Sequence, residues 1–373
     1  MTDTLNGHKR YFVENTWYAA AWETELDDND GRMARTICET PLVLYKTENQ
    51  GYVALDDRCC HRAAPLSIGR VEGNCIRCMY HGLLYDPSGK VTEIPGQSNI
   101  PSSMKVRSYP LCSKGGMLWI WMGDPELANE DDIYHFEPLS QPDKWRGFDK
   151  GDYLHYDANW LLIVDNLSDF SHVAFVHTNT LGGSEDYAYN TIPENIEKMD
   201  NGFSMERWDK GSKAAPFHAK VIPQDELDNP LDRCNITSMY IPGIFLMETI
   251  FAPAGWDAEK NDRSLCREYR NCQFMTPETR NKTHFFWDYL HGFDLDNPDI
   301  SKSLKASLLE GFMEDKLFIE EQQKLLEESP DFVPRFIEAD EAFAHFRRIW
   351  DHRLRAENEA NPLVQKENKK RIL

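Results

Sequence analysis

The sequence contains no apolar run that reaches the roughly 18 residues needed to cross a membrane, although the chain is 373 residues long. Its first residues, MTDTLNGHKRYF, lack the apolar centre of a secretory signal peptide. It also contains no internal repeat and no low-complexity segment. We therefore expect a globular, cytoplasmic protein that does not associate with membranes.

Positive charge is scarce, because 41 Lys and Arg residues face 62 Asp and Glu residues, for a net charge of −21. This balance argues against nucleic acid or an anionic membrane surface as a partner. The segment 58–90 differs, with an excess of three positive charges. These arginines either form a basic face that steers an acidic electron carrier or satisfy nearby backbone and carboxylate groups.

Two common catalytic motifs are also missing. No G-x-G-x-x-G fingerprint for a dinucleotide occurs in the chain, so we expect it to depend on a separate protein for electrons from a nicotinamide cofactor. No H-E-x-x-H motif of a zinc protease occurs either. Nine cysteines without a secretory signal indicate a reducing compartment, where thiols serve metals rather than disulfides.

Two short stretches combine cysteine with histidine. Cys59-x-His61 and Cys78-x-x-His81 are separated by sixteen residues, and each offers one thiolate and one imidazole. A Rieske [2Fe–2S] centre uses such a set, with both sulfurs on one iron and both imidazoles on the other. Structural zinc also accepts two Cys and two His, although zinc fingers group like residues together. Both interpretations stay open on spacing alone.

A second motif lies in the stretch 159–177, which contains Asp169, His172 and His177. Two imidazoles and a later carboxylate make up the facial triad of non-haem Fe(II) oxygenases. Residues five apart lie about 140° apart on an ideal helix, so both histidines can bind one metal only if the helix is distorted or ends between them. Asp169, one turn before His172, is placed to accept a hydrogen bond from a ligand imidazole. The alternative is a pair of ordinary, partly buried histidines.

Taken together, the chain resembles the α subunit of Rieske non-haem iron oxygenases, especially short members similar to vanillate and dicamba O-demethylases. The motifs that carry the resemblance are DRCCHRAAPLSIG (57–69), CMYHGLLYD (78–86), LWIWMGDP (118–125), NWLLIVDNLSDFSHVAFVH (159–177) and GFMEDKLFIEEQQ (311–323). They span most of the chain in the family's order. Cys60 replaces a frequent Pro and Leu83 a frequent Trp, which puts the packing around the cluster in doubt but not its ligands.

The resemblance implies a role for each motif residue. Cys59 and Cys78 would bind the inner iron of a [2Fe–2S] cluster, and His61 and His81 the outer iron. His172, His177 and Asp315 would bind a mononuclear Fe(II). Asp169 would link His81 of one subunit to His172 of its neighbour, which implies a ring, usually a homotrimer. Asn166 would lie in the surroundings of the mononuclear iron.

Asp315 depends most on the resemblance. Residues 303–328 show the periodicity of a long amphipathic helix with many exposed charges. An Asp on such a helix is ordinarily a solvated residue, and four glutamates on the helix compete for the role, namely Glu310, Glu314, Glu320 and Glu321.

The pattern of strands and helices predicts an α+β protein with two domains. Residues 1–125 read as an antiparallel β Rieske domain, with strands at 17–22, 41–45, 52–55, 75–77, 83–85 and 117–121. Residues 126–373 read as a catalytic domain with a polar C-terminal tail. It would hold a central antiparallel sheet, from runs at 202–208, 236–250, 267–275 and 283–291, flanked by helices at 303–328 and 338–356.

The function that the resemblance implies is that of a terminal oxygenase component. It would use O2 and electrons from a ferredoxin or an NAD(P)H-dependent flavin reductase to monooxygenate a substituted aromatic or similar small apolar substrate, by O- or N-dealkylation. A ring-dihydroxylating dioxygenase of the same family and a non-catalytic Rieske electron carrier are the alternatives. Candidate pocket residues are Val173, Val176, Ile244, Phe251, His284, Phe286, Trp287 and Phe312, and the segment 179–196 has the composition of a loop that gates a site.

Overall fold

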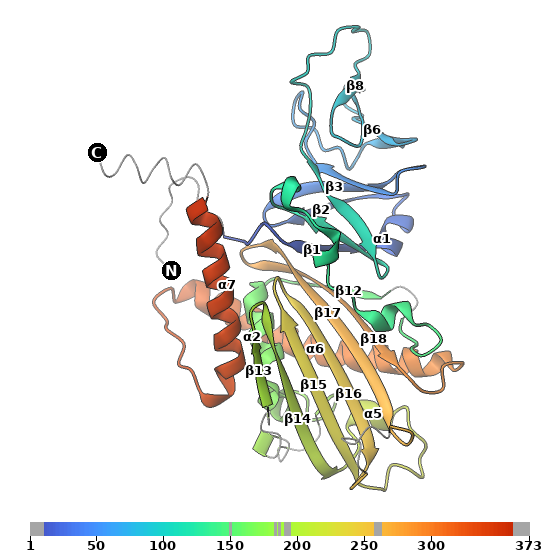
Figure 1. Ribbon diagram of the computed structural model, residues 1–373, viewed down its shortest axis with the longest axis vertical. Helices are drawn as coiled ribbons and strands as arrows, with labels where there is room; N and C mark the ends of the chain where they lie inside the picture. The colour runs from blue at the N-terminus through green and yellow to red at the C-terminus, as the bar shows by residue number, and fades with distance from the viewer. Residues whose placement is uncertain are drawn as a thin grey trace. The chain divides into compact units, whose positions relative to one another are not determined.

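The computed structural model describes residues 11–148, 151–182, 185, 188–189, 195–256 and 263–360 (Figure 1). It divides the chain into two compact units. The first contains residues 12–135 together with the turn 276–280, and the second contains residues 11, 136–275 and 281–360 among those described. The predicted tail after residue 360 and half of the predicted gating loop, namely residues 183–184, 186–187 and 190–194, lie outside the described residues.

The first unit is built from three small antiparallel sheets, with strand orders β1-β11-β10, β2-β3-β4-β9 and β5-β6-β7-β8. The elements are β1 (Trp17–Trp22), α1 (Glu23–Asp27), β2 (Arg32–Ile37), β3 (Thr40–Lys46), β4 (Tyr52–Asp56), β5 (Arg70–Glu72), β6 (Cys75–Arg77), β7 (Leu84–Tyr85), β8 (Val91–Glu93), β9 (Ser108–Tyr109), β10 (Leu111–Lys114), β11 (Met117–Trp121), η1 (Pro125–Leu127) and η2 (Glu130–Asp132).

The strands of this unit form where apolar and β-branched residues cluster between turn residues. β1 and β11 are buried along their whole length and pair with each other, so that the rings of Trp17 and Trp121 lie 5.6 Å apart. A second core, around Leu55, Ile76 and Tyr85, holds the sheet that carries the Cys-His loops. All six strands predicted here are present, each within one residue of its predicted bounds.

The second unit is organised around one antiparallel sheet with the order β12-β18-β17-β16-β15-β14-β13. Its elements are η3 (Glu137–Ser140), β12 (Asp152–Tyr156), α2 (Trp160–Ser168), η4 (Phe170–His172), α3 (Val173–Val176), β13 (Asn195–Met199), β14 (Gly202–Ser212), α5 (Pro216–Ala219), β15 (Leu231–Tyr240), β16 (Ile244–Pro253), β17 (Arg267–Thr279), β18 (Lys282–His291), α6 (Pro298–Glu328), η6 (Glu338–Asp340) and α7 (Glu341–Ala360).

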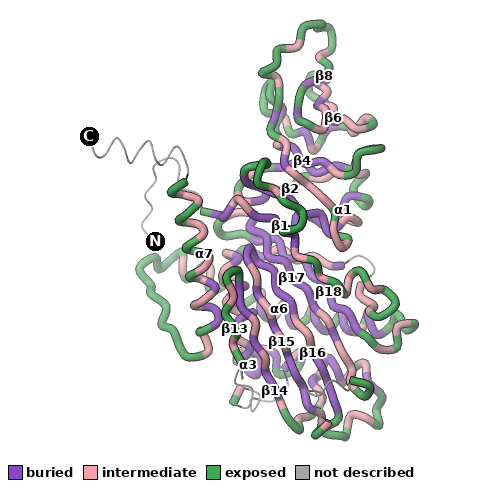
Figure 2. The backbone as a smooth tube through the Cα atoms, in the orientation of Figure 1, coloured by how far each residue is buried: buried purple, intermediate pink, exposed green. Residues whose placement is uncertain are grey.

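One face of the large sheet is covered by helices and buried, as the purple central strands in Figure 2 show. The rings of Phe346 on α7 and Phe312 on α6 contact Phe203 of β14 and Trp287 of β18, respectively. Successive residues of a strand point to opposite faces, so the helix-covered face carries every second residue of each central strand.

The helices α2, α6 and α7 pack on one another over this face, with Trp160 of α2 4.6 Å from the ring of Trp350. Helix α6 begins at Pro298, five residues before the predicted start. The side chain of Asn297 accepts a hydrogen bond from the backbone N–H of Asp299, and Pro298 occupies the first turn, where its missing N–H is tolerated. The predicted helix 338–356 begins with the short turn η6 and continues as α7.

The run 236–250 is not one strand, as its apolar composition indicated, but the hairpin β15–β16. Pro242 lacks the N–H that a ladder requires. Gly243 brings its backbone so close to β17 that a Cβ would lie 2.6 Å from the carbonyl oxygen of Met275. The predicted α+β class is confirmed. Among the described residues, none of the helices combines the length and apolar character of a membrane span.

Candidate metal centres

The two Cys-His stretches form loops that are closed in the same way. Cys59 donates its backbone N–H to Ala64 and its carbonyl accepts from Ala63, while Cys78 donates to Leu83 and accepts from Gly82. In each loop the chain therefore returns to accept a hydrogen bond from its cysteine five residues later. The fourth residue after each cysteine, Ala63 or Gly82, has a positive φ of 57° or 80°. The two loops thus share the same backbone hydrogen bonds and the same positive φ at the fourth residue after the cysteine.

The matched loops separate their sulfurs from their imidazoles. Cys59 and Cys78 are buried, whereas His61 and His81 are exposed and their rings lie 4.6 Å apart. The Tyr85 hydroxyl donates to the Cys59 sulfur at 3.0 Å. Buried sulfur with exposed imidazole fits a cluster whose thiolate-bound iron is internal and whose histidine-bound iron faces outward.

Two of the five basic residues beside these loops form ion pairs. Arg77 binds Glu72 and Glu93, and Arg70 binds Glu72. Arg58 and Arg62 on the first loop, and Lys90, are exposed. Part of the local positive charge is therefore neutralised, and the first loop keeps an exposed basic surface for an electron carrier.

The second donor set is assembled because the helix does break between its histidines, as predicted. Helix α2 ends at Ser168, the 3₁₀ turn η4 carries His172, and the short helix α3 ends at Val176, so that His177 follows with a non-helical φ of −107°. The Asp169 carboxylate accepts from the backbone N–H and the hydroxyl of Ser171 and so starts the turn.

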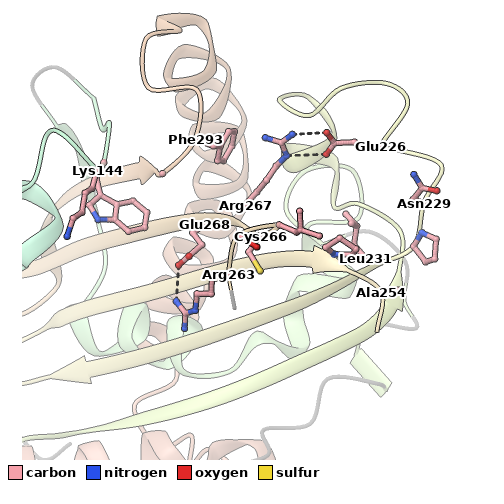
Figure 3. Close-up of a pocket in the computed structure, with 16 residues that line it drawn as sticks. Lys144, Glu226, Asn229, Leu231, Ala254, Arg263, Cys266, Arg267, Glu268 and Phe293 are labelled. Atoms are coloured by element: carbon pink, nitrogen blue, oxygen red, sulfur yellow. Dashed lines mark hydrogen bonds and ion pairs between the residues drawn. The ribbon is translucent and has the colours of Figure 1, made fainter. Parts of the chain in front are cut away.

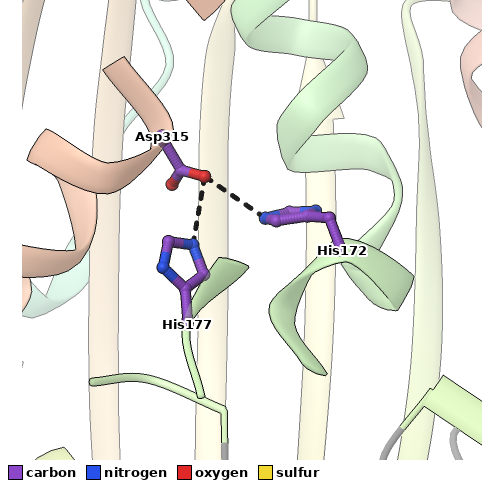
Figure 4. Close-up of side chains that lie close together, drawn as sticks. All are labelled: His172, His177 and Asp315. Carbon is purple, nitrogen blue, oxygen red and sulfur yellow. Dashed lines mark ion pairs between the residues drawn. The ribbon is translucent and has the colours of Figure 1, made fainter. Parts of the chain in front are cut away.

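His172, His177 and Asp315 meet at one point, as Figure 4 shows. Their donor atoms lie within 4.8 Å of one another. The Asp315 Oδ1 atom is 3.0 Å from the His177 Nε2 and 3.5 Å from the His172 Nε2. Ligand bonds of about 2.1 Å place neighbouring donors about 3 Å apart, so the spacing is that of three ligands on one face of a metal ion.

Both imidazoles donate their Nδ1–H to other groups, so the Nε2 lone pairs of His172 and His177 face Asp315. His172 donates its Nδ1–H to the backbone carbonyl of Asp169 at 2.5 Å, and His177 donates its Nδ1–H to the Glu314 carboxylate at 2.7 Å. The buried His177 Nε2 has no hydrogen-bond partner. Three converging acceptors repel one another unless a cation lies among them, so these residues fit a metal ion.

The electrostatics of the triad agree with this donor set. Burial raises the pKa of Asp315, but the neighbouring His172 and His177 imidazoles outweigh burial and hold the pKa at about 2. Burial lowers the pKa of His177, whereas Asp315 and Glu314 raise it, and the net direction is upward. The carboxylate is thus ionised at neutral pH, and the two acids favour a positive charge beside His177.

Two residues around the triad take roles that differ from the predicted ones. The Asp169 carboxylate does not receive the His172 proton, because it caps η4, and the Asp169 backbone carbonyl receives it instead. Glu314, predicted only as a competitor of Asp315, orients His177 and also accepts from the Thr180 hydroxyl. Asn166 donates to Asp315 at 2.9 Å, consistent with its predicted place beside the metal.

We expect Glu314→Ala to weaken the binding of Fe(II) about 10- to 100-fold, the usual effect of losing a carboxylate that orients a ligand imidazole. Glu314→Gln keeps an acceptor for the His177 Nδ1–H, so its loss should be smaller than about tenfold. Anaerobic chelator competition measures the affinity. Glu310→Ala, at an exposed residue one turn earlier on α6, is the control. Wild-type affinity in Glu314→Ala would contradict this role.

A small cavity of about 60 Å³ opens beside the triad. Its lining combines the three donors with apolar and polar side chains, namely Asn166, Leu167, Phe170, Val173, Leu181, Phe217, Arg233, Phe245, Met247, Asn271, Gln273, Tyr289, Leu308 and Phe312. A cavity of about 150 Å³ accepts benzene in another protein. Entry of an aromatic ring therefore requires flexible lining side chains such as Met247 to move.

Of the eight predicted pocket residues, Val173 and Phe312 line this cavity, whereas Val176, Ile244, Phe251, His284, Phe286 and Trp287 do not. Strand alternation explains three of these differences: Ile244 neighbours the lining residue Phe245, and His284 and Phe286 alternate with Trp287, which faces α6. Phe251 instead stacks on His218 with ring centres 3.8 Å apart. The ring of Trp287 packs behind Phe312 at 4.8 Å.

A larger groove of about 890 Å³ lies elsewhere in the second unit (Figure 3). None of the triad residues lines it. Arg267 pairs with Glu226 at 2.8 Å, and Arg263 pairs with Glu268 at 2.8 Å. The two carboxylates among its described lining residues are thus engaged by arginines, and those residues form no donor set for a metal.

The comparisons with known proteins agree with both donor sets. Residues 16–110 match the model of the Rieske [2Fe-2S] domain, and residues 156–356 match that of the vanillate O-demethylase oxygenase C-terminal domain. The first match decides between cluster and zinc in favour of the cluster, because it covers both Cys-His loops. The second contains His172, His177 and Asp315.

Curated relatives extend over nearly the whole chain. The iron-sulfur subunit of the toluene-4-sulfonate monooxygenase system of Comamonas testosteroni is 38% identical over 348 residues, covering 93% of this chain and 98% of the relative. The oxygenase component of dicamba O-demethylase of Stenotrophomonas maltophilia is 31% identical over 341 residues, covering 90% and 96%. The crystal structure of dicamba monooxygenase bound to dicamba superposes with a TM-score of 0.83 at 29% identity, covering 93% and 99%.

Proposed function

The chain belongs to the Rieske non-haem iron oxygenases with a vanillate O-demethylase-type catalytic domain, and on this premise we propose that it is the terminal oxygenase component of a multicomponent monooxygenase. The observation that carries the proposal is the convergence of His172, His177 and Asp315 beside a cavity, in a chain that also holds the Cys-His loops. A non-catalytic electron carrier would have no use for the triad.

The candidate ligands form two separate binding sites. Cys59, Cys78, His61 and His81 would hold the [2Fe–2S] cluster, and the triad would hold Fe(II). When bound, these groups supply one-electron transfer and the activation of O2, respectively. The chain's own contribution is to keep both triad imidazoles in the tautomer whose Nε2 would bind the metal, through the Asp169 carbonyl and Glu314, and to place the triad in the wall of the cavity.

The reaction we propose is oxidative O- or N-dealkylation of a substituted aromatic ring. One oxygen atom of O2 enters a C–H bond of the alkyl group, and the other leaves as water with electrons and protons from the redox partner. The resulting hemiacetal or hemiaminal collapses to an aldehyde and the free hydroxyl or amine. Support comes from relatives named as dicamba and vanillate O-demethylases.

The electron donor is proposed to be a ferredoxin, a flavin reductase that uses NAD(P)H, or both. The chain lacks a dinucleotide fingerprint, and its relatives are described as components or subunits of larger systems. Exposed Arg58 and Arg62 beside the cluster loops offer a contact for an acidic carrier.

We further propose that copies of the chain assemble head to tail into a closed ring of three. Large apolar side chains are exposed beside the cluster loops, at Ile68, Met79 and Tyr80, and beside the triad, at Phe175 and Met313. Exposed apolar groups near both redox centres favour contact between the cluster loops of one copy and the triad region of the next. Asp169 would then bridge the two centres across that contact, with its carboxylate on His81 of the neighbouring copy and its backbone carbonyl on His172.

The test of the proposed function is substrate-dependent O2 uptake by the enzyme with both centres filled, supplied with electrons by a ferredoxin and its reductase. Aryl methyl ethers and N-alkyl amides should release an aldehyde in proportion to the O2 consumed. His172→Ala should take up electrons at its cluster but release no aldehyde. A cis-diol product would assign ring dihydroxylation instead, and no uptake with any aromatic compound would refute the proposal.

A further inference from the structure

Two carboxamide oxygens in the cavity are buried without a hydrogen-bond partner in the part of the chain that is described. Asn271 and Gln273 are each 2% exposed, and the Asn271 Oδ1 and Gln273 Oε1 atoms are buried without a partner. Both residues line the cavity beside the triad. Buried polar side chains almost always have a hydrogen-bond partner, so these two groups are arranged for a molecule that enters the cavity.

The backbone holds both carboxamides toward the cavity. They lie two residues apart on β17, in register with Met247 and Phe245 of β16, which line the same cavity. Side chains two residues apart on a strand share a face. Because β17 lies inside the seven-stranded sheet, the two amides cannot turn to solvent without disrupting the ladder.

Arg233 on β15 brings a positive charge to the same cavity. It is 7% exposed, its guanidinium lies 5.6 Å from the ring centre of Phe217 and 5.5 Å from that of Phe251, and one of its nitrogens donates to the Leu181 carbonyl at 3.3 Å. Among the described lining residues, Arg233 is the only Lys or Arg. The triad member Asp315 is the only residue among them with a carboxylate.

We propose, as a consequence that rests on the proposed function, that the substrate is an aromatic acid. Its carboxylate or sulfonate lies against Arg233, and the carboxamides of Asn271 and Gln273 hydrogen-bond the polar atoms of the ring's substituents. Charge-assisted hydrogen bonds from a planar guanidinium suit either acid, particularly in an apolar pocket that excludes water.

The positions of Arg233, Asn271 and Gln273 along the sheet would fix the orientation of a bound substrate. Asn271 of β17 lies opposite Met247 of β16, and Arg233 of β15 lies opposite Phe251 of β16. Met247 and Phe251 are four residues apart, so Asn271 and Arg233 are offset along the sheet by about 13 Å at roughly 3.3 Å per residue. The long Arg233 side chain shortens this gap. An acid anchored at Arg233 would therefore extend its ring along the sheet toward the carboxamides of Asn271 and Gln273.

Matched acid and neutral ligands test the charge requirement in the wild-type enzyme with both centres filled. The pairs are 4-methylbenzenesulfonate with its sulfonamide, and 4-methoxybenzoate with its methyl ester. Anaerobic calorimetry should show each acid binding at least about tenfold more tightly than its neutral partner, as expected for charge-assisted hydrogen bonds. Equal or tighter binding of both neutral partners would overturn the proposal.

Variants separate recognition from structure. Arg233→Met should weaken acid binding at least about tenfold and neutral binding less than about threefold. The double variant Asn271→Leu with Gln273→Met should keep or raise the melting temperature, because two buried amide oxygens without hydrogen-bond partners give way to apolar groups of similar volume, while acid binding falls about tenfold. Unchanged acid binding in the double variant, or a lowered melting temperature without a loss of binding, would contradict the assignment of the carboxamides.

Thr237→Val is the matched control. The Thr237 Oγ1 atom is also buried without a partner. Thr237 and Asn271 both lie opposite Met247, on its two sides, but Thr237 does not line the cavity. This variant should leave acid binding unchanged. If neutral aromatic compounds alone drive O2 uptake, the inference fails and the proposed function stands. If no aromatic compound drives it, the proposed function itself fails.

Discussion

Asp315→Ala should remove the mononuclear iron and abolish oxygenation while leaving the cluster intact. Metal analysis should fall from about three irons to about two per chain, with about two acid-labile sulfides in both proteins. Product formation should fall by more than about a hundredfold, beyond the effect of losing a residue that merely supports a ligand. The physical reason is that Asp315 supplies the only negative charge of the triad, with its Oδ1 atom 3.0 Å from the His177 Nε2.

The control for this variant is Glu321→Ala, which removes an exposed carboxylate from the same helix. It should retain the full iron content and activity. Retention of the third iron in Asp315→Ala would show that another carboxylate completes the site, and Glu314, the acid that already contacts His177, would be the residue to test next. Loss of sulfide together with iron would mean that the substitution disrupts the protein rather than one centre.

Asp169→Asn should leave both metal centres filled yet slow the reoxidation of the reduced cluster by O2 and substrate about a hundredfold, the upper end of the effect of removing such a carboxylate partner. In the proposed ring, the carboxylate accepts an N–H from His81 of the neighbouring copy, while the His172 Nδ1–H stays on the Asp169 backbone carbonyl. An amide is an uncharged acceptor that also presents a donor NH2 group, so the hydrogen bond to His81 is weakened or lost. Rapid mixing of reduced enzyme with O2, followed at the cluster chromophore, measures the rate.

The local structure should survive this change. Asn caps a helical turn about as well as Asp, and the His172 proton is held by the backbone carbonyl of Asp169 rather than by its side chain. Ser171→Ala is the control, because it removes the hydroxyl that donates to the Asp169 carboxylate but keeps the charge. Its rate should stay close to that of the wild type. Normal turnover in Asp169→Asn would eliminate the bridge.

Local patterns in the sequence were enough to predict much of the fold and to single out the Cys-His loops and the two histidines of the triad, whereas Asp315 followed from the family resemblance. Six strands of the first unit and both long helices follow from apolar periodicity and turn residues. The distorted helix between His172 and His177 follows from a spacing that a regular helix cannot use for one metal. These features depend on residues close together in the chain, for which spacing is a direct guide to geometry.

The boundaries were less accurate where a single residue decides them. Asn297 and Pro298 start α6 earlier than its amphipathic pattern indicates. Pro242 and Gly243 divide an apolar run into two strands. In both cases a capping or turn residue outweighs the periodicity of its neighbours.

By itself, the sequence determined the α+β class and the order of the Cys-His and His motifs, which are properties of residue type and local spacing, while the resemblance to a known family supplied the complete donor sets, Asp315 included. Only the tertiary structure decided that Glu314 and a backbone carbonyl orient the imidazoles, and that Arg233, Asn271 and Gln273 rather than His284 or Ile244 face the cavity. The reason is that such contacts join residues far apart in the chain. They depend on strand register and on how helices pack over one face of a sheet, neither of which is encoded in local spacing.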